Sequence, residues 1–213
     1  MKQETLRPRR RLSASTMREA AMSLFDRFHA DPHLDETYKG RPLLGFELEK
    51  HAGRGEIRRY TPHLFAAVTA RGPQDEAFEK GFATLTDYAC GGNADEVQVP
   101  VAVPASQFLV AHGRGCADGR EWRVAVPIPL DRPATGVATP EDPSVTIRRA
   151  RHERLAIWRL DPDEMDDPFG AETCLRGWLE GYGIVPLGQV RLLFHDDPLT
   201  PADRRRTEIA LPV

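Results

Sequence analysis

The chain has 213 residues, of which 40% are hydrophobic and 29% are charged, and its formal net charge is −3. This composition is ordinary for a globular protein of one or two domains, and the length is enough to bury a core. The slight negative charge excludes a general electrostatic affinity for nucleic acid or for an anionic membrane surface.

The first 45 residues are expected to form a tail, a helix and a linker. Thr16-Met17-Arg18-Glu19 matches a capping box, in which the threonine hydroxyl and the glutamate carboxylate bind backbone N–H groups at the start of a helix. The apolar residues of this helix have helical spacing: Met17, Ala20, Ala21, Leu24, Phe25 and Phe28. Asp31-Pro32 ends it. We expect the helix to pack on the main domain; the alternative is a homodimer formed through it.

A main domain is expected to begin near residue 46. In chain order the pattern predicts a short strand at 46–51, a strand at 56–70 interrupted by Pro62, a helix at 74–90, a strand at 97–103, and a hairpin of strands at 107–112 and 121–126. The predicted helix has one apolar stripe, which consists of Phe78, Phe82, Leu85 and Ala89.

Residues 127–144 are rich in proline and are expected to connect two halves of this domain. Beyond them the pattern predicts a strand at 145–160, a helix in the later part of 163–182, and strands at 187–194 and 207–213. One face of this second helix carries Leu175, Trp178, Leu179 and Tyr182.

The two halves are similar in sequence. Ile57-Arg58-Arg59 returns as Ile147-Arg148-Arg149, an offset of 147 − 57 = 90 residues, and each copy leads into an apolar run and then a helix. Self-similarity at so long a period indicates a duplicated unit. We therefore expect an α+β fold, in which two pseudo-symmetric βαββ-type repeats at about 46–130 and 140–213 form a distorted antiparallel β-barrel flanked by two helices.

Signatures of catalysis or of export are missing from the sequence. It has no G-x-S-x-G elbow, no P-loop, no Rossmann fingerprint and no H-E-x-x-H. No apolar run approaches the roughly 18 residues of a membrane span, and the N-terminus has no apolar signal-peptide core. Cys90, Cys116 and Cys174 form no C-x-x-C pair, which argues against a disulfide scaffold or a zinc site and indicates a reducing, cytoplasmic compartment.

A few side chains are candidates for a binding site. Arg204-Arg205-Arg206 precedes the last strand, where guanidinium forks bind carboxylates or phosphates if they face a ligand and form a solvated turn if they do not. Glu208 alternates with Ile209, so it is a buried acid if its face lines a cavity and has no role if that face meets water. Cys90 precedes two glycines, and a small core residue is its simpler interpretation.

Five short motifs, taken in order, resemble the SOUL haem-binding family. They are Glu56-Ile57-Arg58-Arg59-Tyr60-Thr61-Pro62 (E-I-R-x-Y-x-P), Tyr88-Ala89-Cys90-Gly91-Gly92-Asn93 (Y-x-x-G-G-N), Trp122–Pro127, Pro140–Val145 (P-x-D-P-x-V), and a closing block of Asp197–Pro201, Arg204-Arg205, Glu208 and Pro212 (D-P-x-x-P…R-R-x-E). Their order and spacing hold from about residue 46 to residue 213, and residues 1–45 lie outside the resemblance.

The resemblance implies a distorted barrel of two repeated halves, and binding of haem or a related tetrapyrrole in a shallow apolar groove beside the first helix. On this chain the groove falls on Phe78, Phe82 and Leu85, for which core packing is the other interpretation. We expect such a protein to be a non-enzymatic carrier, buffer or sensor.

Polar partners for a tetrapyrrole follow from the same resemblance. The lysine that some members have in the closing block is Thr200 here, which leaves Arg204 or Arg205 to bind a propionate. His63 and Cys90 are weak candidates for an iron ligand, since histidine and cysteine are both axial ligands of haem.

Two other functions stay open. In fold the family resembles gyrase-inhibitor-like effector-binding domains, where an inward glutamate meets cationic aromatic ligands; Glu208 would have that role, with Trp158 or Trp178 as a stacking wall. Some domains of this architecture are hydrolases, but the sequence pairs Glu208 with no second catalytic group, so we expect no enzyme activity. We expect neither a nucleic acid nor a membrane as a partner.

Overall fold

The structure, a computed structural model, describes residues 37–112, 120–129, 136–164, 167–168, 170–198 and 200–213. The helices and strands in these ranges are β1 (Thr37–Tyr38), β2 (Arg41–Pro42), β3 (Phe46–Ala52), β4 (Gly55–Tyr60), β5 (His63–Arg71), α2 (Gln74–Ala89), β6 (Ala105–His112), β7 (Arg120–Ile128), β8 (Thr146–Ala150), β9 (Glu153–Arg159), η2 (Pro162–Glu164), α3 (Gly170–Glu180), β10 (Arg191–Phe194), η3 (Ala202–Arg204) and β11 (Thr207–Pro212).

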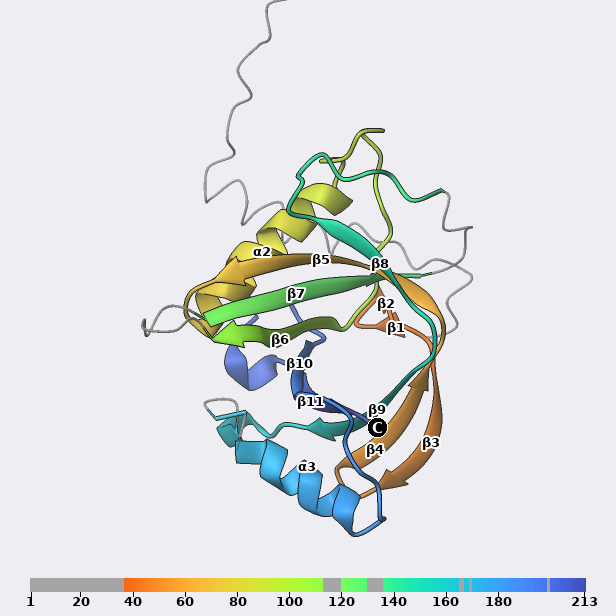
Figure 1. Cartoon of the computed structure of the whole chain (residues 1–213), viewed down its shortest axis with the longest axis vertical. Coiled ribbons are helices and arrows are strands. Elements are labelled where there is room, and N and C mark those ends of the chain that lie inside the picture. Colours follow the sequence, from red (N-terminus) through yellow and green to blue (C-terminus); the bar gives the residue numbers. More distant parts are fainter. Residues whose placement is uncertain (1–36, 113–119, 130–135, 165–166, 169, 199) are drawn as a thin grey trace, which may run out of the picture.

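A large antiparallel sheet organises the domain. Within the described residues nine strands follow the order β3-β4-β9-β11-β10-β6-β7-β5-β8. The sheet curves strongly, and α2 and α3 lie on its outer side at opposite ends of the molecule (Figure 1). The α+β class is therefore confirmed. The predicted barrel is corrected to an open sheet, because the end strands β3 and β8 have no pairing with each other in the described part.

Each half of the chain gives one strand to the other half. β4 pairs with β9, and β8 pairs with β5, although β5 follows β4 directly in the sequence. The predicted strand at 56–70 is therefore two strands, which separate at Thr61-Pro62 because proline has no N–H for a sheet ladder. The predicted strand at 145–160 is also two strands, β8 and β9, which separate at Arg151-His152.

The order of elements repeats along the chain. β4-β5-α2-β6-β7 is followed by β8-β9-α3-β10-β11, so the order in each half is ββαββ, where βαββ was expected. The predicted hairpin of β6 and β7 is confirmed by their antiparallel register. Duplication of an ancestral unit stays a prediction.

Helix α2 covers the outer face of β5 and β7. Its predicted apolar stripe is buried there with alternate strand residues such as Ala66 and Val124. The helix approaches the sheet closely at Gly81, where an added Cβ would lie 2.7 Å from Val124 Cγ2. Helix α3 buries Leu175 and Leu179 over the other end of the sheet, as its stripe predicted.

The valine run at 97–103 is not a strand, contrary to the alternation of its side chains. Pro100 and Pro104 have no N–H group, and four other N–H donors go to four different partners: Val97 to the Asn93 side chain, Val99 to Ala89, Ala102 to Pro127 and Val103 to Pro42. Burial does not alternate either: Val99, Val101 and Val103 are in the core beneath α2, Ala102 is buried in another cluster, and Val97 is exposed.

Residues 37–45, expected to be part of a linker, pack on the domain. β1 and β2 form a small hairpin, Leu43 pairs with Val103, and Leu44 is buried. The capping box and the helix predicted before them lie outside the described residues, so the homodimer stays a prediction. In the part of the chain that is described, no helix has the length and apolar character needed to cross a membrane.

Two helical glycines test the close packing of α2 on β7. Gly81→Ala is expected to lower the free energy of unfolding by about 1–3 kcal/mol, because the new Cβ meets a buried β-branched side chain. Gly177 in α3 has open space at its Cβ position, so Gly177→Ala should raise stability by about 0.5–1 kcal/mol through helix propensity. Urea unfolding measures both changes, and equal effects would contradict the tight contact.

Candidate functional site

The concave face of the sheet carries a cavity where the two halves meet. Its volume is about 140 Å³. Strand register places alternate residues on this face, with Ser106 opposite Leu193 and Phe108 opposite Arg123. The residues that line it are Leu44, Tyr60, His63, Phe65, Pro104, Ser106, Phe108, Arg123, Ala125, Pro127, Glu153, Leu155, Arg191 and Leu193. The wall is thus mainly aromatic and aliphatic, with a few polar groups.

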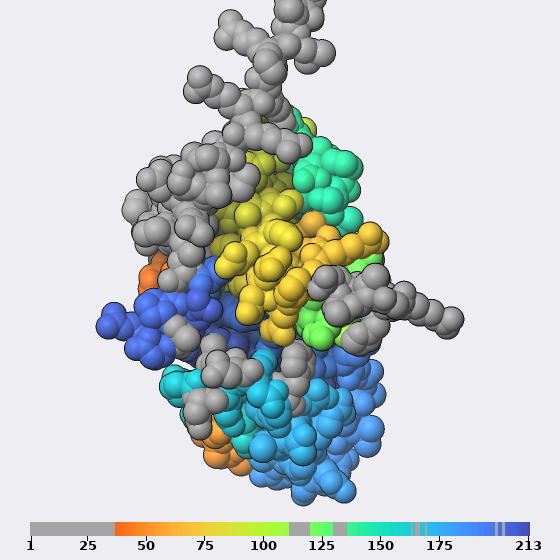
Figure 2. Space-filling view, turned by 90° about the vertical axis from the view of Figure 1, so that its left-hand side faces the viewer, coloured from red at the N-terminus to blue at the C-terminus, as the bar shows by residue number. Residues whose placement is uncertain are grey.

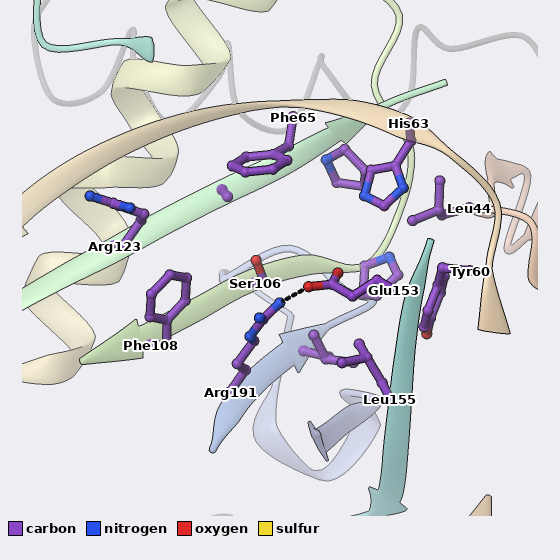
Figure 3. A pocket seen from close by; sticks show the side chains of 14 residues that line it. Leu44, Tyr60, His63, Phe65, Ser106, Phe108, Arg123, Glu153, Leu155 and Arg191 are labelled. Carbon is purple, nitrogen blue, oxygen red and sulfur yellow. Dashed lines mark hydrogen bonds and ion pairs between the residues drawn. The ribbon is translucent and has the colours of Figure 1, made fainter. Parts of the chain in front are cut away.

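Two arginines and one glutamate supply the charge of the cavity wall (Figure 3). Arg191 Nη1 donates to Glu153 Oε1 at 2.6 Å. The guanidinium carbons of Arg123 and Arg191 lie 5.9 and 5.4 Å from the centre of the Phe108 ring, within reach of a cation–π contact. Among the described residues Arg123 has no carboxylate partner within 4.0 Å. The wall therefore has an excess of positive charge.

His63 faces the cavity from the start of β5. Its side chain is buried, and the ring lies beneath the strand, toward Leu44 (Figure 3). Its Nδ1 is 2.8 Å from the backbone oxygen of Thr61. Because a carbonyl oxygen can only accept, Nδ1 carries the proton in the neutral ring and Nε2 carries the lone pair.

Tyr60 connects the cavity with a buried cluster of charged side chains. Arg58 donates to the Tyr60 hydroxyl at 3.4 Å and binds both oxygens of Glu208, at 2.8 and 3.1 Å. Arg206 donates twice to Glu208 Oε1, at 2.6 and 3.0 Å, and His195 Nε2 lies 2.9 Å from Oε2. Glu208 is 0% exposed, so it is a buried acid, but two guanidinium groups already balance its charge.

The charge states of this cluster follow from burial and pairing. Burial alone raises the pKa of Glu208, but the hydrogen bond from His195 and the charge of Arg58 hold that pKa well below its ordinary value. Burial lowers the pKa of His195 despite the opposing effect of Glu208, so the ring is neutral at pH 7 and donates its Nε2–H. Burial also raises the pKa of Tyr60 to about 12, which keeps the phenol protonated.

The same region anchors the segment that precedes β3. Asp196 accepts hydrogen bonds from Tyr38 Oη at 3.0 Å, from Lys39 Nζ at 2.9 Å and from the Arg206 backbone N–H at 2.7 Å. In Figure 2 the start of the described chain, in orange, lies against the dark blue C-terminal segment. Asp196, which follows β10, thus binds a distant part of the chain.

The residues assigned to a groove beside the first helix lie in the core. Phe78, Phe82 and Leu85 are 6%, 3% and 1% exposed, and the Phe78 ring centre lies 4.1 Å from that of Phe194. They are on the outer side of the sheet, and none of them lines the cavity. Core packing is the interpretation that these positions fit, and a contact with a ligand stays a prediction.

Three further predicted site residues, Arg204, Arg205 and Cys90, also lie away from the cavity, whereas His63 lines it. Arg204 is exposed on η3, and Arg205 donates to the backbone oxygens of Pro198 and Thr200. Cys90 is exposed at the end of α2, so its interpretation as a small core residue is wrong. The described ranges hold no group of three or more His, Cys, Asp or Glu side chains that could bind a metal ion.

Sequence reasoning missed the charged residues of the cavity wall. A signal for Arg123 was present, because it alternates with Trp122 and Val124 in a run that is otherwise apolar. If those two side chains enter the outer core, the arginine must point to the concave face. Glu153 and Arg191 come from strands whose pairing through β11 is not visible in the sequence.

The buried cluster predicts how stability depends on pH. The pKa of His195 is depressed in the folded state, so its contribution to the free energy of unfolding is lost as pH falls below the ordinary value of 6.5. The corresponding loss for Glu208 begins below 4.5. Urea unfolding between pH 7 and pH 5 should show stability falling by at most about 1.4 kcal/mol per pH unit from His195. His195→Gln should flatten this slope, and the exposed His152→Gln should not; equal slopes in all three proteins would contradict it.

Comparison with solved structures shows the fold. An uncharacterized conserved protein from Listeria innocua superposes with a TM-score of 0.56 at 14% identity, over 75% of this chain and 91% of that one. The C-terminal domain of EcmrR gives 0.53 at 11% identity, over 74% and 95%, and a hydrolase from Listeria innocua gives 0.51 at 13%, over 75% and 91%. No curated protein sequence is significantly similar to the chain.

Comparison of the sequence with family profiles identifies the family of the chain, whereas the solved structures show only its fold. A profile of the SOUL heme-binding protein family matches residues 43–212, which include every strand of the large sheet, the cavity wall and the buried cluster. The match also starts at Leu43, where the chain joins the core through its pairing with Val103. The chain therefore belongs to the SOUL heme-binding protein family.

Proposed function

We propose that this protein binds haem or a related tetrapyrrole without covalent attachment, as a carrier, buffer or sensor, in the cavity on the concave face. Membership of the family supports a ligand of this class. The observation that carries the placement is the guanidinium group of Arg123, which lies beside the Phe108 ring in a wall that also contains Phe65, and which has no carboxylate partner in the described chain. A flat macrocycle with propionates needs both an apolar wall and such donors.

The residues of the cavity fit a tetrapyrrole in chemistry and in part in size. The volume of about 140 Å³ is below the roughly 300–1,000 Å³ of sites that enclose a drug-sized molecule. We therefore infer that the macrocycle enters only in part and that the remainder stays toward solvent. This is the shallow mode that the resemblance implied, at the concave face instead of the face of α2.

The chain's own groups have distinct roles in this proposal. Phe65 and Phe108 would exclude water from the inserted part of the macrocycle, and Arg123 and Arg191 would bind the propionates. A propionate at Arg191 competes with Glu153, which now accepts its hydrogen bond at 2.6 Å. A haem would supply an iron centre able to change oxidation state, and the protein would bind, orient and release it.

Cationic aromatic ligands fit this structure less well. That hypothesis uses Glu208 as the counter-charge, yet this carboxylate is buried and already holds Arg58 and Arg206. The carboxylate that does line the cavity, Glu153, is paired with Arg191. The excess charge of the wall is positive, which favours an anionic ligand.

Titration of the full chain with haemin should give a Soret band that saturates at micromolar concentration or below. Arg123→Gln is expected to weaken binding roughly 10- to 100-fold, because a hydrogen bond to a charged group contributes about 1.5–3 kcal/mol. The matched control is Arg204→Gln, which removes an exposed guanidinium outside the cavity and should leave the affinity unchanged. Absorbance titration measures all three proteins.

Two outcomes would contradict the proposal at different levels. If no Soret band appears when the unaltered protein is titrated with haemin, the proposal of haem binding itself is contradicted. Normal binding by Arg123→Gln together with weak binding by Arg204→Gln would move the site from the concave face to the closing block.

A further inference from the structure

We propose that His63 is the axial ligand of the iron when haem occupies the concave cavity, with Nε2 as the ligating atom. The inference rests on the function proposed above and adds the metal contact to it. Among the side chains that line the cavity His63 has the one imidazole, and no cysteine or methionine is present there. It is thus the strongest nitrogen or sulfur donor that the cavity offers.

The backbone presets the tautomer that a metal requires. Nδ1 of His63 is held by the Thr61 carbonyl at 2.8 Å, so the lone pair lies on Nε2. No described residue forms a hydrogen bond with Nε2. A carbonyl on the far nitrogen is the usual outer partner of a metal-bound histidine, because it orients the ring and raises its basicity.

The outer partner is itself fixed in place. Thr61 binds the Gly45 oxygen twice, through its backbone N–H at 3.0 Å and through its hydroxyl at 3.1 Å. Pro62 limits rotation of the short link between Thr61 and the imidazole. Phe65, whose ring centre is 6.5 Å away, packs beside the histidine ring. The imidazole therefore needs little reordering to bind a metal.

The positions of the imidazole and the guanidinium groups match the chemistry of haem. Figure 3 shows His63 at one end of the cavity and Arg123 at the other, and Phe65 lies between them along the wall that β5 and β7 form. In haem the iron is at the centre of the macrocycle and both propionates are on one edge. The cavity likewise has separate donors: His63 for the iron, and Arg123, at the other end of the aromatic wall, for a propionate.

Other described candidates for the iron are less suitable. Cys90 lies outside the cavity at the end of α2. His195 is buried, and its Nε2 is engaged by Glu208 at 2.9 Å. His51 and His152 are exposed and do not line the cavity.

The test compares haemin with metal-free protoporphyrin IX on the full chain. His63→Ala should bind haemin roughly tenfold or more weakly, with a displaced Soret maximum and loss of the ferric electron paramagnetic resonance signal of a nitrogen-ligated iron. Its affinity for metal-free protoporphyrin, followed by fluorescence, should be unchanged. Added imidazole should restore the haemin spectrum. His63→Gln keeps a side chain of similar length and should behave as His63→Ala does, and the exposed His51→Ala serves as the control.

The outcomes separate the two proposals. If both His63 variants keep the haemin affinity and spectrum of the unaltered protein, His63 is not the ligand, while the tetrapyrrole site stands. If both porphyrins lose affinity equally in the variants, His63 packs against the macrocycle and does not bind iron. If neither porphyrin binds the unaltered protein, the proposed function fails and the ligand assignment fails with it.

Discussion

The ion pair between Arg58 and Glu208 joins the two halves of this fold. Arg58 is on β4, from the first half, and Glu208 is on β11, from the second half, and β9 lies between these strands. Both side chains are almost fully buried, so removal of Glu208 would leave the guanidinium groups of Arg58 and Arg206 without the carboxylate that they share, at a cost of about 3–5 kcal/mol. The pair also specifies the arrangement, because β4 must leave β5 and lie beside β9 for the two groups to meet.

The same pair connects two of the motifs on which the resemblance to the family depends. Arg58 belongs to the E-I-R-x-Y-x-P motif and Glu208 to the closing block, and the structure brings these two motifs together 150 residues apart in sequence. They meet in the interior and hold strands in place. Arg58 and Glu208 are therefore evidence for the fold. Other motif residues, Tyr60 and Arg123, line the cavity, whose wall also contains Phe65, Phe108 and Arg191 from outside the motifs.

Much of the fold was predictable because its signals are local. The stripe of Phe78, Phe82 and Leu85 gave α2 and its buried face, and the alternation of the strands gave most of the sheet. The pairing of β4 with β9 and of β5 with β8 was not predictable, because the residues around Thr61-Pro62 do not indicate which strands will lie beside β4 and β5. The strand predicted at 97–103 was wrong for a related reason. Its valines alternate in the sequence, but its prolines and the separate partners of its N–H groups prevent the hydrogen-bond ladder of a strand.

The candidate cavity was harder to predict than the fold because it depends on strand order. Glu153 and Arg191 form an ion pair only because β11 inserts between β9 and β10 and curvature brings their concave sides together. His63 was named from its residue type alone, and its tautomer follows from a backbone oxygen that only coordinates reveal.

The place of β11 in the sheet has a consequence for synthesis of the protein. Residues 207–212 are made after all the other strands, yet they occupy the gap between β9 and β10. Until the ribosome has added them, β9 and β10 each expose an unpaired edge, and α3 lacks Ile209 and Leu211, which complete its apolar contact with the sheet. Such edges bind other unfinished chains readily. Nascent chains of this protein should therefore need protection by chaperones until the last strand emerges.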